Sequence, residues 1–182
     1  MKKWKVYVLR LSHRPSRDKR VTTHLFLAAR AFGADGAFYS GQRDDKIERS
    51  VKKVSKSWGG SFEVEYAEDW RKLVKQWNKD GGETLHLTVY GLPLQDVIGH
   101  VTASPKDKLV VVGGAKVPGA VYELADWNVS VTSQPHSEVS ALSVFLHELF
   151  EGRELSKSYE DSGMRVVPQA RGKRVMRTKH EF

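Results

Sequence analysis

VSVTSQPHSEVSALSVFLHELF, residues 129–150, joins a short apolar run to a long periodic segment through a compact polar corner. The apolar run is typical of a buried strand. Five large apolar side chains of the later segment recur at helical spacing: Leu142, Phe145, Leu146, Leu149 and Phe150. Ser137 is suited to cap the first turn of that helix. In α/β proteins such a corner lies at the carboxyl end of the sheet, where ligands bind. The stretch therefore predicts an α/β fold with a binding site at this corner.

The same pairing of strand and helix repeats along the rest of the chain. Strand-like runs occupy residues 5–11, 37–40, 61–66, 84–90, 108–114 and 127–131. Helical patterns lie between them, over residues 22–32, 47–58, 70–77 and 94–101 and after Pro118. Thr22 and Thr23 are the expected caps of the first helix, and Gly59-Gly60 is expected to end the second. This order predicts a mainly parallel sheet with helices on both faces, within one domain over residues 1–153.

Composition narrows the possible functions. The 182 residues carry 30 Lys and Arg against 22 Asp and Glu, a formal net charge of +8, and no cysteine. The missing cysteines exclude disulfides, thiolate zinc sites and a cysteine nucleophile. No apolar stretch approaches the roughly 18 residues of a membrane span. We expect a globular cytoplasmic protein that acts without a membrane partner.

The positive charge is concentrated in two clusters. HRPSRDKR, residues 13–20, carries four Arg and Lys against one acid, and residues 165–179 carry six without an acid. Each cluster alone is compatible with a solvated face, but together with the basic excess they favour a nucleic-acid partner. The expected RNA-binding side chains are Arg14, Arg17, Lys19, Arg171, Lys173 and Arg174.

The helical pattern fades after Gly152, which leaves residues 154–182 as a basic C-terminal extension. MRVV and RVMR within it predict one short hairpin. Three interpretations remain open for this extension: an RNA contact, a brace for a dimer, or a frayed end.

Three strands are expected to end in glycine-bearing or polar corners. These corners are LTVYG, VVGGAKVPG and VSVTSQPHSE, at residues 87–91, 111–119 and 129–138. Each one alone is compatible with an ordinary turn. Parallel neighbours would bring all three to one edge, where glycines allow close backbone approach and a helix N-terminus offers free N–H groups. Together they predict a pocket for an adenosine-containing cofactor.

Several motifs are absent from the sequence. GGAKVPG lacks the GxxxxGK[ST] spacing of a phosphate-binding loop, and no GxGxxG occurs. His147-Glu148 does not continue into HExxH, because residue 151 is Glu, so no zinc site is expected. A nucleotide hydrolase that uses His136 and Ser137 lacks the G-x-S-x-G elbow.

Four long stretches resemble a known family: HRPSRDKRVTTHLFLAARAFGA, HLTVYG, VVGGAKVPGAVYELADWNVSV and QPHSEVSALSVFL. They are similar to the archaeal tRNA cytidine-56 2′-O-methyltransferases, members of the SPOUT class of S-adenosylmethionine-dependent enzymes. The similarity extends from about Lys5 to Leu155. It implies a C-terminal trefoil knot, a homodimer, S-adenosyl-L-methionine as cofactor, no metal, and tRNA as substrate. The alternative is a non-catalytic RNA-binding protein on the same fold.

The resemblance also implies which residues line the cofactor pocket. By the family pattern they are Leu87, Tyr90, Gly91, Gly113, Gly114, Ala115, Lys116, Val117, Val131, Thr132, Ser133, Gln134, Pro135, His136, Ser137 and Glu138.

The catalytic arginine departs from the pattern of related 2′-O-methyltransferases. Where those enzymes place an asparagine and an arginine, this sequence has Val21 and Leu27. We therefore expect the role to pass to Arg20, with Arg17 second. Arg20 would bind the adjacent phosphate and stabilise the charge that develops on the 2′-oxygen. His24 is a further possible proton acceptor.

Overall fold

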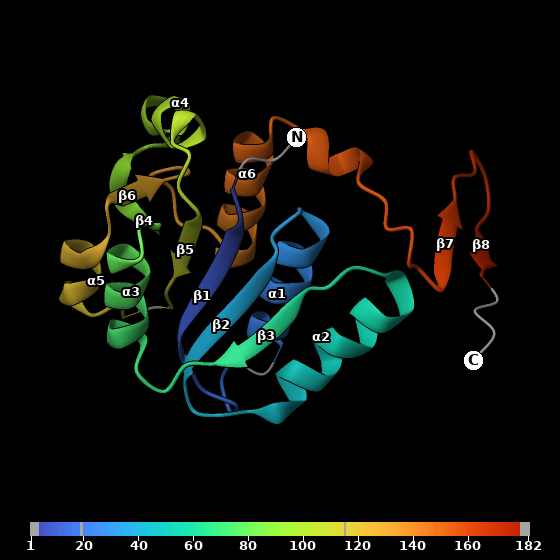
Figure 1. The fold of residues 1–182 in the computed structure, drawn as a ribbon, viewed down its shortest axis with the longest axis horizontal. Coiled ribbons are helices and arrows are strands. Elements are labelled where there is room, and N and C mark those ends of the chain that lie inside the picture. The colour runs from blue at the N-terminus through green and yellow to red at the C-terminus, as the bar shows by residue number, and fades with distance from the viewer. Residues whose placement is uncertain (1–3, 19, 115, 179–182) are drawn as a thin grey trace.

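The computed structural model describes residues 4–18, 20–114 and 116–178. Its main sheet has six parallel strands in the order β3-β2-β1-β5-β4-β6 (Figure 1). The strands are β1 (Val6–His13), β2 (Gly36–Gly41), β3 (Glu63–Tyr66), β4 (Glu83–Pro93), β5 (Lys108–Val112) and β6 (Trp127–Ser130). The predicted parallel sheet is confirmed.

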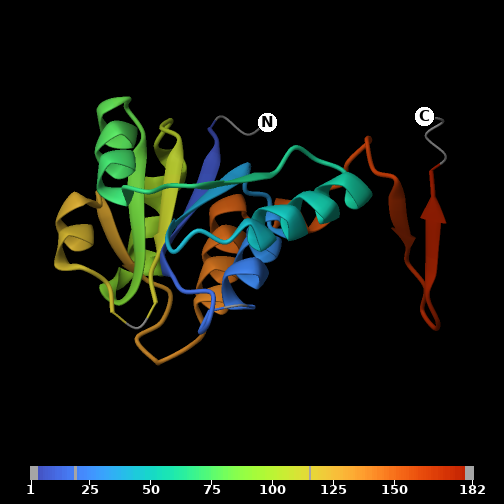
Figure 2. The ribbon, with the colours of Figure 1, turned by 90° about the horizontal axis from the view of Figure 1, so that it is seen from below.

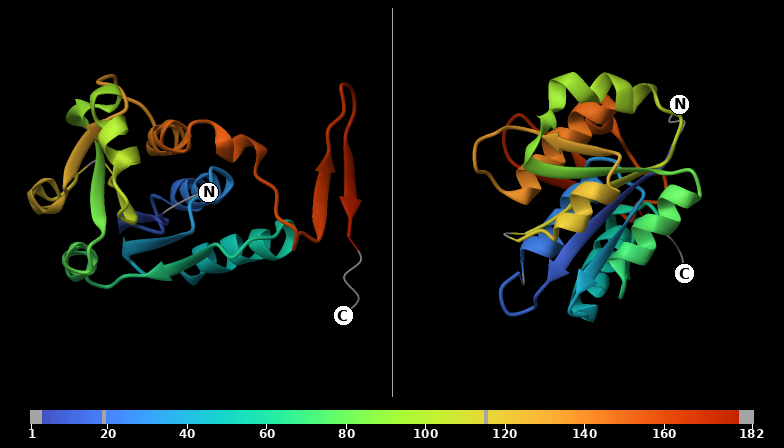
Figure 3. Two further views of the ribbon diagram at one scale, coloured as in Figure 1. Left: turned by 45° about the horizontal axis from the view of Figure 1, so that its top comes forward. Right: turned by 90° about the vertical axis from the view of Figure 1, so that its left-hand side faces the viewer.

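Helices cover both faces of this sheet, as predicted. They are α1 (Val21–Ala31), α2 (Asp45–Trp58), α3 (Trp70–Lys79), α4 (Leu94–Ala103), α5 (Gly119–Leu124) and α6 (Glu138–Phe150), followed by the 3-10 helix η1 (Arg153–Ser156). Figures 1 and 3 show α3 and α5 on the opposite side of the sheet from α1 and α6. Two buried clusters match these layers, because α1, α2, α4 and α6 pack in the larger one and α3 and α5 in the smaller.

The order of the strands creates a topological switch point. From β1 the chain builds outward through β2 and β3, whereas β5, β4 and β6 extend the sheet in the other direction. β1 and β5 therefore lie side by side, with Arg10 paired to Val112 near their carboxyl ends. Ligands of open α/β sheets bind in the crevice at such a point.

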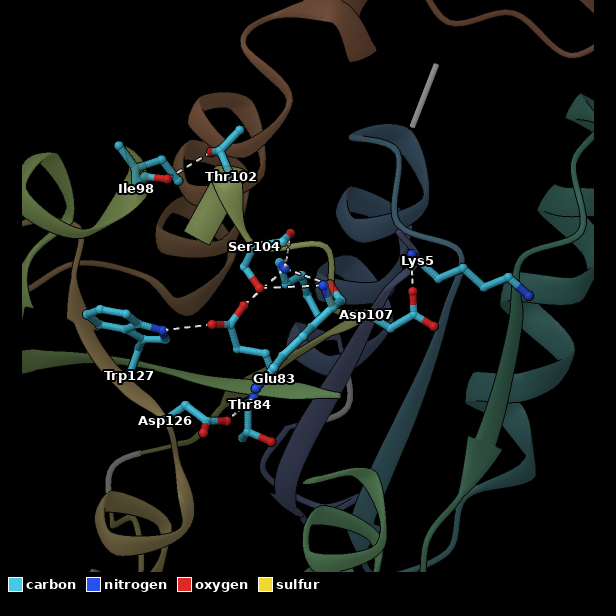
Figure 4. A network of polar contacts seen from close by, with 11 residues as sticks. Lys5, Glu83, Thr84, Ile98, Thr102, Ser104, Asp107, Asp126 and Trp127 are labelled. Carbon is cyan, nitrogen blue, oxygen red and sulfur yellow. Dashed lines mark hydrogen bonds and ion pairs between the residues drawn. The ribbon is translucent and has the colours of Figure 1, made fainter. Parts of the chain in front are cut away.

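The opposite, amino edge of β4, β5 and β6 is held by a buried polar network (Figure 4). The Lys108 ammonium lies 3.0 Å from the Glu83 carboxylate, and both side chains are almost fully buried. Trp127 Nε1 donates a hydrogen bond to the same carboxylate at 2.9 Å. At the neighbouring strand end, the Asp126 carboxylate accepts from the backbone N–H of Thr84. This network ties three strands together far from the switch point.

The first helix begins differently from the prediction. Arg20 occupies the N-cap and makes no side-chain capping bond. Thr22 lies inside the helix, fully buried, with its hydroxyl 2.8 Å from Nδ1 of His13. The expected Thr cap is wrong because a tertiary contact to β1 takes this hydroxyl. In contrast, the Ser137 hydroxyl caps α6 by accepting from the N–H of Val139 at 3.2 Å, as predicted.

The C-terminal extension forms the predicted hairpin. β7 (Met164–Val167) pairs antiparallel with β8 (Arg174–Arg177), and the pair stands apart from the main sheet (Figures 1 and 2). The segment before it docks on the end of α2, where the Asp161 carboxylate accepts from the N–H of Gly60 at 3.0 Å. The ring of Tyr159 lies under the guanidinium of Arg30, 5.2 Å from Cζ. The extension is therefore anchored at its base, and the interpretation as a frayed end is wrong for residues 164–177.

Candidate functional site

Two cavities adjoin at the carboxyl ends of β1, β4 and β5. The first, which we call the corner cleft, has a volume of about 590 Å³. Its lining comes from all three predicted corners and from the strands and helices beside them: His86, Leu87, Thr88, Val89, Tyr90, Val112, Gly113, Gly114, Lys116, Val117, Tyr122, Val131, His136, Glu138 and Ala141. The expected convergence of the three corners is confirmed.

The corner cleft combines apolar and polar walls, and His86 is one of its hydrogen-bonded polar groups. Asn128 Nδ2 donates to the carbonyl oxygen of Tyr122 at 3.0 Å, so its Oδ1 faces Nδ1 of His86 at 2.9 Å. Nδ1 therefore carries the proton, and Nε2 is an acceptor without a partner among the described residues. Burial lowers the pKa of His86, although the Asn128 hydrogen bond acts in the opposite direction. The ring is neutral, and its acceptor nitrogen is buried in the wall of the cleft.

Two glycines shape this cleft because a side chain would not fit there. A Cβ on Gly91 would lie 2.5 Å from backbone atoms of Asn128 and Val129, so β4 and β6 approach closely only because this residue is glycine. A Cβ on Gly113 would lie 2.1 Å from Cγ2 of Val117. The loop after β5 folds back on itself at this point and forms one wall of the cleft.

The second cavity, which we call the basic cleft, has a volume of about 620 Å³. It is lined by Arg10, Ser12, His13, Arg14, Arg17, Asp18, Gly41, Gln42, Gly114, Lys116 and Glu138. Gly114, Lys116 and Glu138 thus line both cavities, and we call this shared boundary the junction. A pocket of small-molecule size meets a cationic groove there.

Arg10 forms part of the floor of the basic cleft, and the sequence analysis missed it. The residue is only 2% exposed, and its Nη2 lies 3.5 Å from Glu138 Oε1. A Cβ on Gly114 would lie 3.4 Å from the same nitrogen, so the loop after β5 lies directly against the guanidinium. The signal was a charged residue inside the apolar strand VYVLRL, because an arginine is almost never buried without a partner.

His13 anchors the cationic loop that follows β1. Its ring is fully buried, with Nδ1 at Thr22 of α1 and Nε2 3.7 Å from the Asp44 carboxylate. Burial lowers the pKa of His13, while the nearby carboxylates of Asp44 and Asp18 act in the opposite direction. Both ends of the loop are therefore fixed to the body of the protein, and the loop between them lines the basic cleft.

The structure brings nine of the expected cofactor residues together around the corner cleft: Leu87, Tyr90, Gly113, Gly114, Lys116, Val117, Val131, His136 and Glu138. Other described members of the prediction do not line it: Gly91, Thr132, Ser133, Gln134, Pro135 and Ser137. Ala115 lies outside the described residues. Gly91 acts indirectly, since it sets the approach of β4 to β6.

The expected RNA-binding residues fall into two separate places. Arg14 and Arg17 line the basic cleft, and Lys19 lies outside the described residues. Arg20 is exposed at the start of α1 and is not among the described residues that line either cavity. Arg171, Lys173 and Arg174 belong to the tip and second strand of the hairpin, which lies apart from the loop of residues 13–18 (Figure 2).

The geometry does not support a hydrolase. Nδ1 of His136 lies 3.2 Å from the carbonyl oxygen of Ser137, whereas the Ser137 hydroxyl accepts from the backbone of α6. Nucleophilic catalysis needs the hydroxyl and the base within hydrogen-bonding reach of each other. In this structure the hydroxyl is engaged as a helix cap.

Comparison with known proteins identifies the family. The family model described as tRNA ribose 2′-O-methyltransferase, aTrm56, matches residues 58–176. A tRNA (cytidine(56)-2′-O)-methyltransferase from Methanothermobacter thermautotrophicus is 56% identical over 168 residues, which cover 92% of this chain and 94% of that protein. One from Pyrococcus horikoshii is 50% identical over 174 residues, 94% of this chain and 84% of that protein. The chain belongs to this family. The resemblance noted in the sequence is confirmed.

Solved structures agree on the fold of this tRNA ribose 2′-O-methyltransferase. The TrmH/SpoU tRNA modifying enzyme of A. aeolicus superimposes with a TM-score of 0.60 at 15% identity, over 85% of this chain and 77% of that one. The SpoU methyltransferase AviRb from Streptomyces viridochromogenes, in complex with AdoMet, superimposes with a TM-score of 0.59 at 15% identity. The superposition covers 84% of this chain and 59% of that one. Both are SpoU-type folds.

Two further observations concern the described part of this family member. Within residues 4–18, 20–114 and 116–178, no group of three or more His, Cys, Asp or Glu side chains is arranged to hold a metal ion. Among the helices of the same residues, none has the length and apolar character needed to cross a membrane.

Proposed function

We propose that this enzyme transfers a methyl group from S-adenosyl-L-methionine, bound in the corner cleft, to the ribose 2′-hydroxyl of cytidine 56 in tRNA held in the basic cleft. The observation that carries the proposal is the junction, where a pocket of ligand size opens into a cationic groove. Methyl transfer requires that the donor and the ribose meet at one point, and the junction provides it.

The corner cleft fits S-adenosyl-L-methionine by size and chemistry. Its volume of about 590 Å³ lies within the range of small-molecule sites, and its walls combine apolar side chains with polar ones. His86 contributes a fully buried ring to the wall of the cleft. The bound cofactor supplies a methyl group on a positively charged sulfur. Of the expected lining, Leu87, Val117 and Val131 offer the apolar contacts.

The residues of the basic cleft position the tRNA. Arg14 and Arg17 offer charged donors to phosphate oxygens, and a planar guanidinium is well suited to bidentate contacts. We assign the stabilisation of the reacting nucleotide to Arg20, which is exposed at the start of α1 outside the described lining of both clefts, with Arg17, which lines the basic cleft, second. Positioning of two reactants can lower a reaction barrier by roughly 7–11 kcal/mol, and a loop fixed at both ends is suited to position the tRNA.

Five further features belong to the same proposal. The enzyme acts as a homodimer in the cytoplasm, where its tRNA substrate is found. Residues 1–153 form the α/β domain, its C-terminal part forms a trefoil knot, and residues 154–182 form a basic extension. Support for an RNA contact of the extension comes from its hairpin, which carries five arginine and lysine residues and no acid between residues 164 and 178. Support for a dimer comes from apolar side chains that one subunit leaves exposed, among them Tyr90 and Leu92 beside the corner cleft.

The test is methyl transfer to unmodified tRNA, followed by mapping of the modified sugar. We expect one 2′-O-methyl group at position 56, dependent on S-adenosyl-L-methionine. Calorimetry with the cofactor alone distinguishes this enzyme from the alternative, a non-catalytic RNA-binding protein. Such a protein would bind tRNA without binding the cofactor. Tight tRNA binding with neither cofactor binding nor methyl transfer would refute the proposal.

A further inference from the structure

The reaction proposed above leaves one proton without an assigned acceptor, and the inference that follows rests on that proposed function. The 2′-oxygen forms a bond to the methyl carbon, and the carbon–sulfur bond breaks with its electron pair remaining on the sulfur. The oxygen must also release its hydrogen as a proton to a nearby base. That base has to lie where the two clefts meet, because the reacting oxygen lies there.

Among the described residues, the junction contains one suitable group. Of the residues that line both clefts, Gly114 has no side chain, and the Lys116 ammonium has donors only. The third is Glu138, whose carboxylate is a proton acceptor. Its side chain is 33% exposed, so a ligand in either cleft can reach it.

Other titratable groups nearby are less well placed. His86 and His136 line the corner cleft without lining the basic cleft, whereas His13 and Asp18 line only the basic cleft. Arginine is a poor base because its pKa lies above about 12. His24, considered from the sequence, is exposed on α1 and lines neither cleft among the described residues.

Arg10 is placed to orient the carboxylate. Its buried guanidinium contacts Glu138 at 3.5 Å, while its Nε and Nη1 have no hydrogen-bond partner among the described residues. A buried donor without a partner is costly, by about 1–3 kcal/mol or more for a charged group. Both nitrogens are closed to solvent, so the guanidinium acts on the site through its contact with the Glu138 carboxylate. The pair joins the carboxyl end of β1 to the first residue of α6 across the switch point.

We infer that Glu138 is the catalytic base that takes the proton of the 2′-hydroxyl, and that Arg10 is the residue that positions the Glu138 carboxylate. The proton passes from the ribose oxygen to a carboxylate oxygen as the oxygen–carbon bond forms. It is then released to solvent through the exposed part of the side chain.

The test uses the full-length enzyme with unmodified tRNA and S-adenosyl-L-methionine. General-base catalysis typically contributes about 10²–10⁴-fold, so Glu138→Gln is expected to lower kcat within that range. Calorimetric Kd values for cofactor and for tRNA are expected to stay within about threefold of wild type, a change of under 1 kcal/mol. Glu148→Gln is the matched control, because Glu148 is an exposed carboxylate further along the same helix.

Chemical rescue distinguishes a base from a structural role. Glu138→Ala removes the carboxylate and leaves space that opens to solvent, so added formate should restore part of kcat, and acetamide, which has no carboxylate, should not. Arg10→Lys should lower kcat with little change in KM, and formate should not rescue it, since its Glu138 is intact.

The inference would be overturned if Glu138→Gln kept wild-type kcat, or if its loss of activity followed a matching loss of cofactor affinity. In the second case Glu138 holds the cofactor. Wild-type enzyme that bound both ligands but transferred no methyl group would refute the proposed function itself. The two failures are therefore distinguishable.

Discussion

Removing the Lys108 ammonium should destabilise the fold strongly while leaving the site intact. Lys108 Nζ lies 3.0 Å from the Glu83 carboxylate and donates to the carbonyl oxygens of Ser104 at 3.0 Å and Lys106 at 2.6 Å. In Lys108→Met the carboxylate stays buried with the hydrogen bond from Trp127, and both carbonyl oxygens lose a donor. Removing one partner of a buried pair costs about 3–5 kcal/mol. For a chain of this length the melting temperature should fall by roughly 6–20 °C, at about 2–4 °C per kcal/mol.

Urea unfolding of four variants tests this magnitude. Glu83→Gln should cost less than Lys108→Met, because an amide can still accept from an indole N–H. The double variant should recover part of the loss, since no charge is then buried without a partner. Lys106→Met is the matched control: its side chain is exposed, and it should stay within about 0.5 kcal/mol of wild type.

Cofactor binding below the melting temperature should be unchanged in all four variants, because the network lies at the amino edge of the sheet and the corner cleft at the carboxyl edge. If Lys108→Met lowered the free energy of unfolding by less than about 1 kcal/mol, the reasoning would be refuted. A change that small is what an exposed ion pair contributes.

Four further outcomes are expected. Burial lowers the folded-state pKa of His86, so the unfolded chain binds the proton first as the pH falls. Below pH 6.5 this one group should reduce the free energy of unfolding by at most about 1.4 kcal/mol per pH unit. Urea titrations over this pH range should show a steeper loss of stability in wild type than in His86→Gln. Gly113→Ala, whose Cβ would overlap Val117, should weaken cofactor binding by about tenfold or more in calorimetry, since overpacking costs about 1–3 kcal/mol. Arg20→Ala should lower kcat by about 10²–10³-fold, and near-normal turnover would exclude the assignment. Deleting residues 164–182 should make the slope of log K for tRNA binding against log salt concentration shallower, by roughly one unit for each phosphate that the hairpin neutralises. An unchanged slope together with a dissociated dimer would assign the hairpin to dimerisation.

The elements that local sequence encodes could be predicted. The apolar run at residues 108–112 became a fully buried central strand, and the stripe in residues 138–150 became a helix against the core. Gly59-Gly60 ended α2, with both glycines at positive φ. Each of these features depends on neighbours within one or two turns, so the periodicity of the residues was sufficient.

Interactions between distant segments could not be predicted in the same way. Thr22 has the chemistry of a helix cap, but its hydroxyl bonds to His13 in the preceding strand, and no local rule encodes that choice. The convergence of the three corners was predictable because parallel strands share a carboxyl edge. The exact set of residues that line the cleft was not predictable. Pro135 and Ser137 do not line it, whereas His86, from the interior of β4, does.

Arg10 illustrates what strand order adds to the sequence. In the sequence, Arg10 is a charged residue inside an apolar strand. A buried charge of this kind needs either a buried partner or a ligand. The sequence could not choose, because both the partner Glu138 and the neighbour Gly114 lie more than a hundred residues away. Placing β1 beside β5 brings all three together, satisfies one side of the guanidinium with the carboxylate, and leaves the other donors without a partner among the described residues. What the pair offers a ligand at the switch point is the Glu138 carboxylate, which Arg10 holds in place and which opens to both clefts.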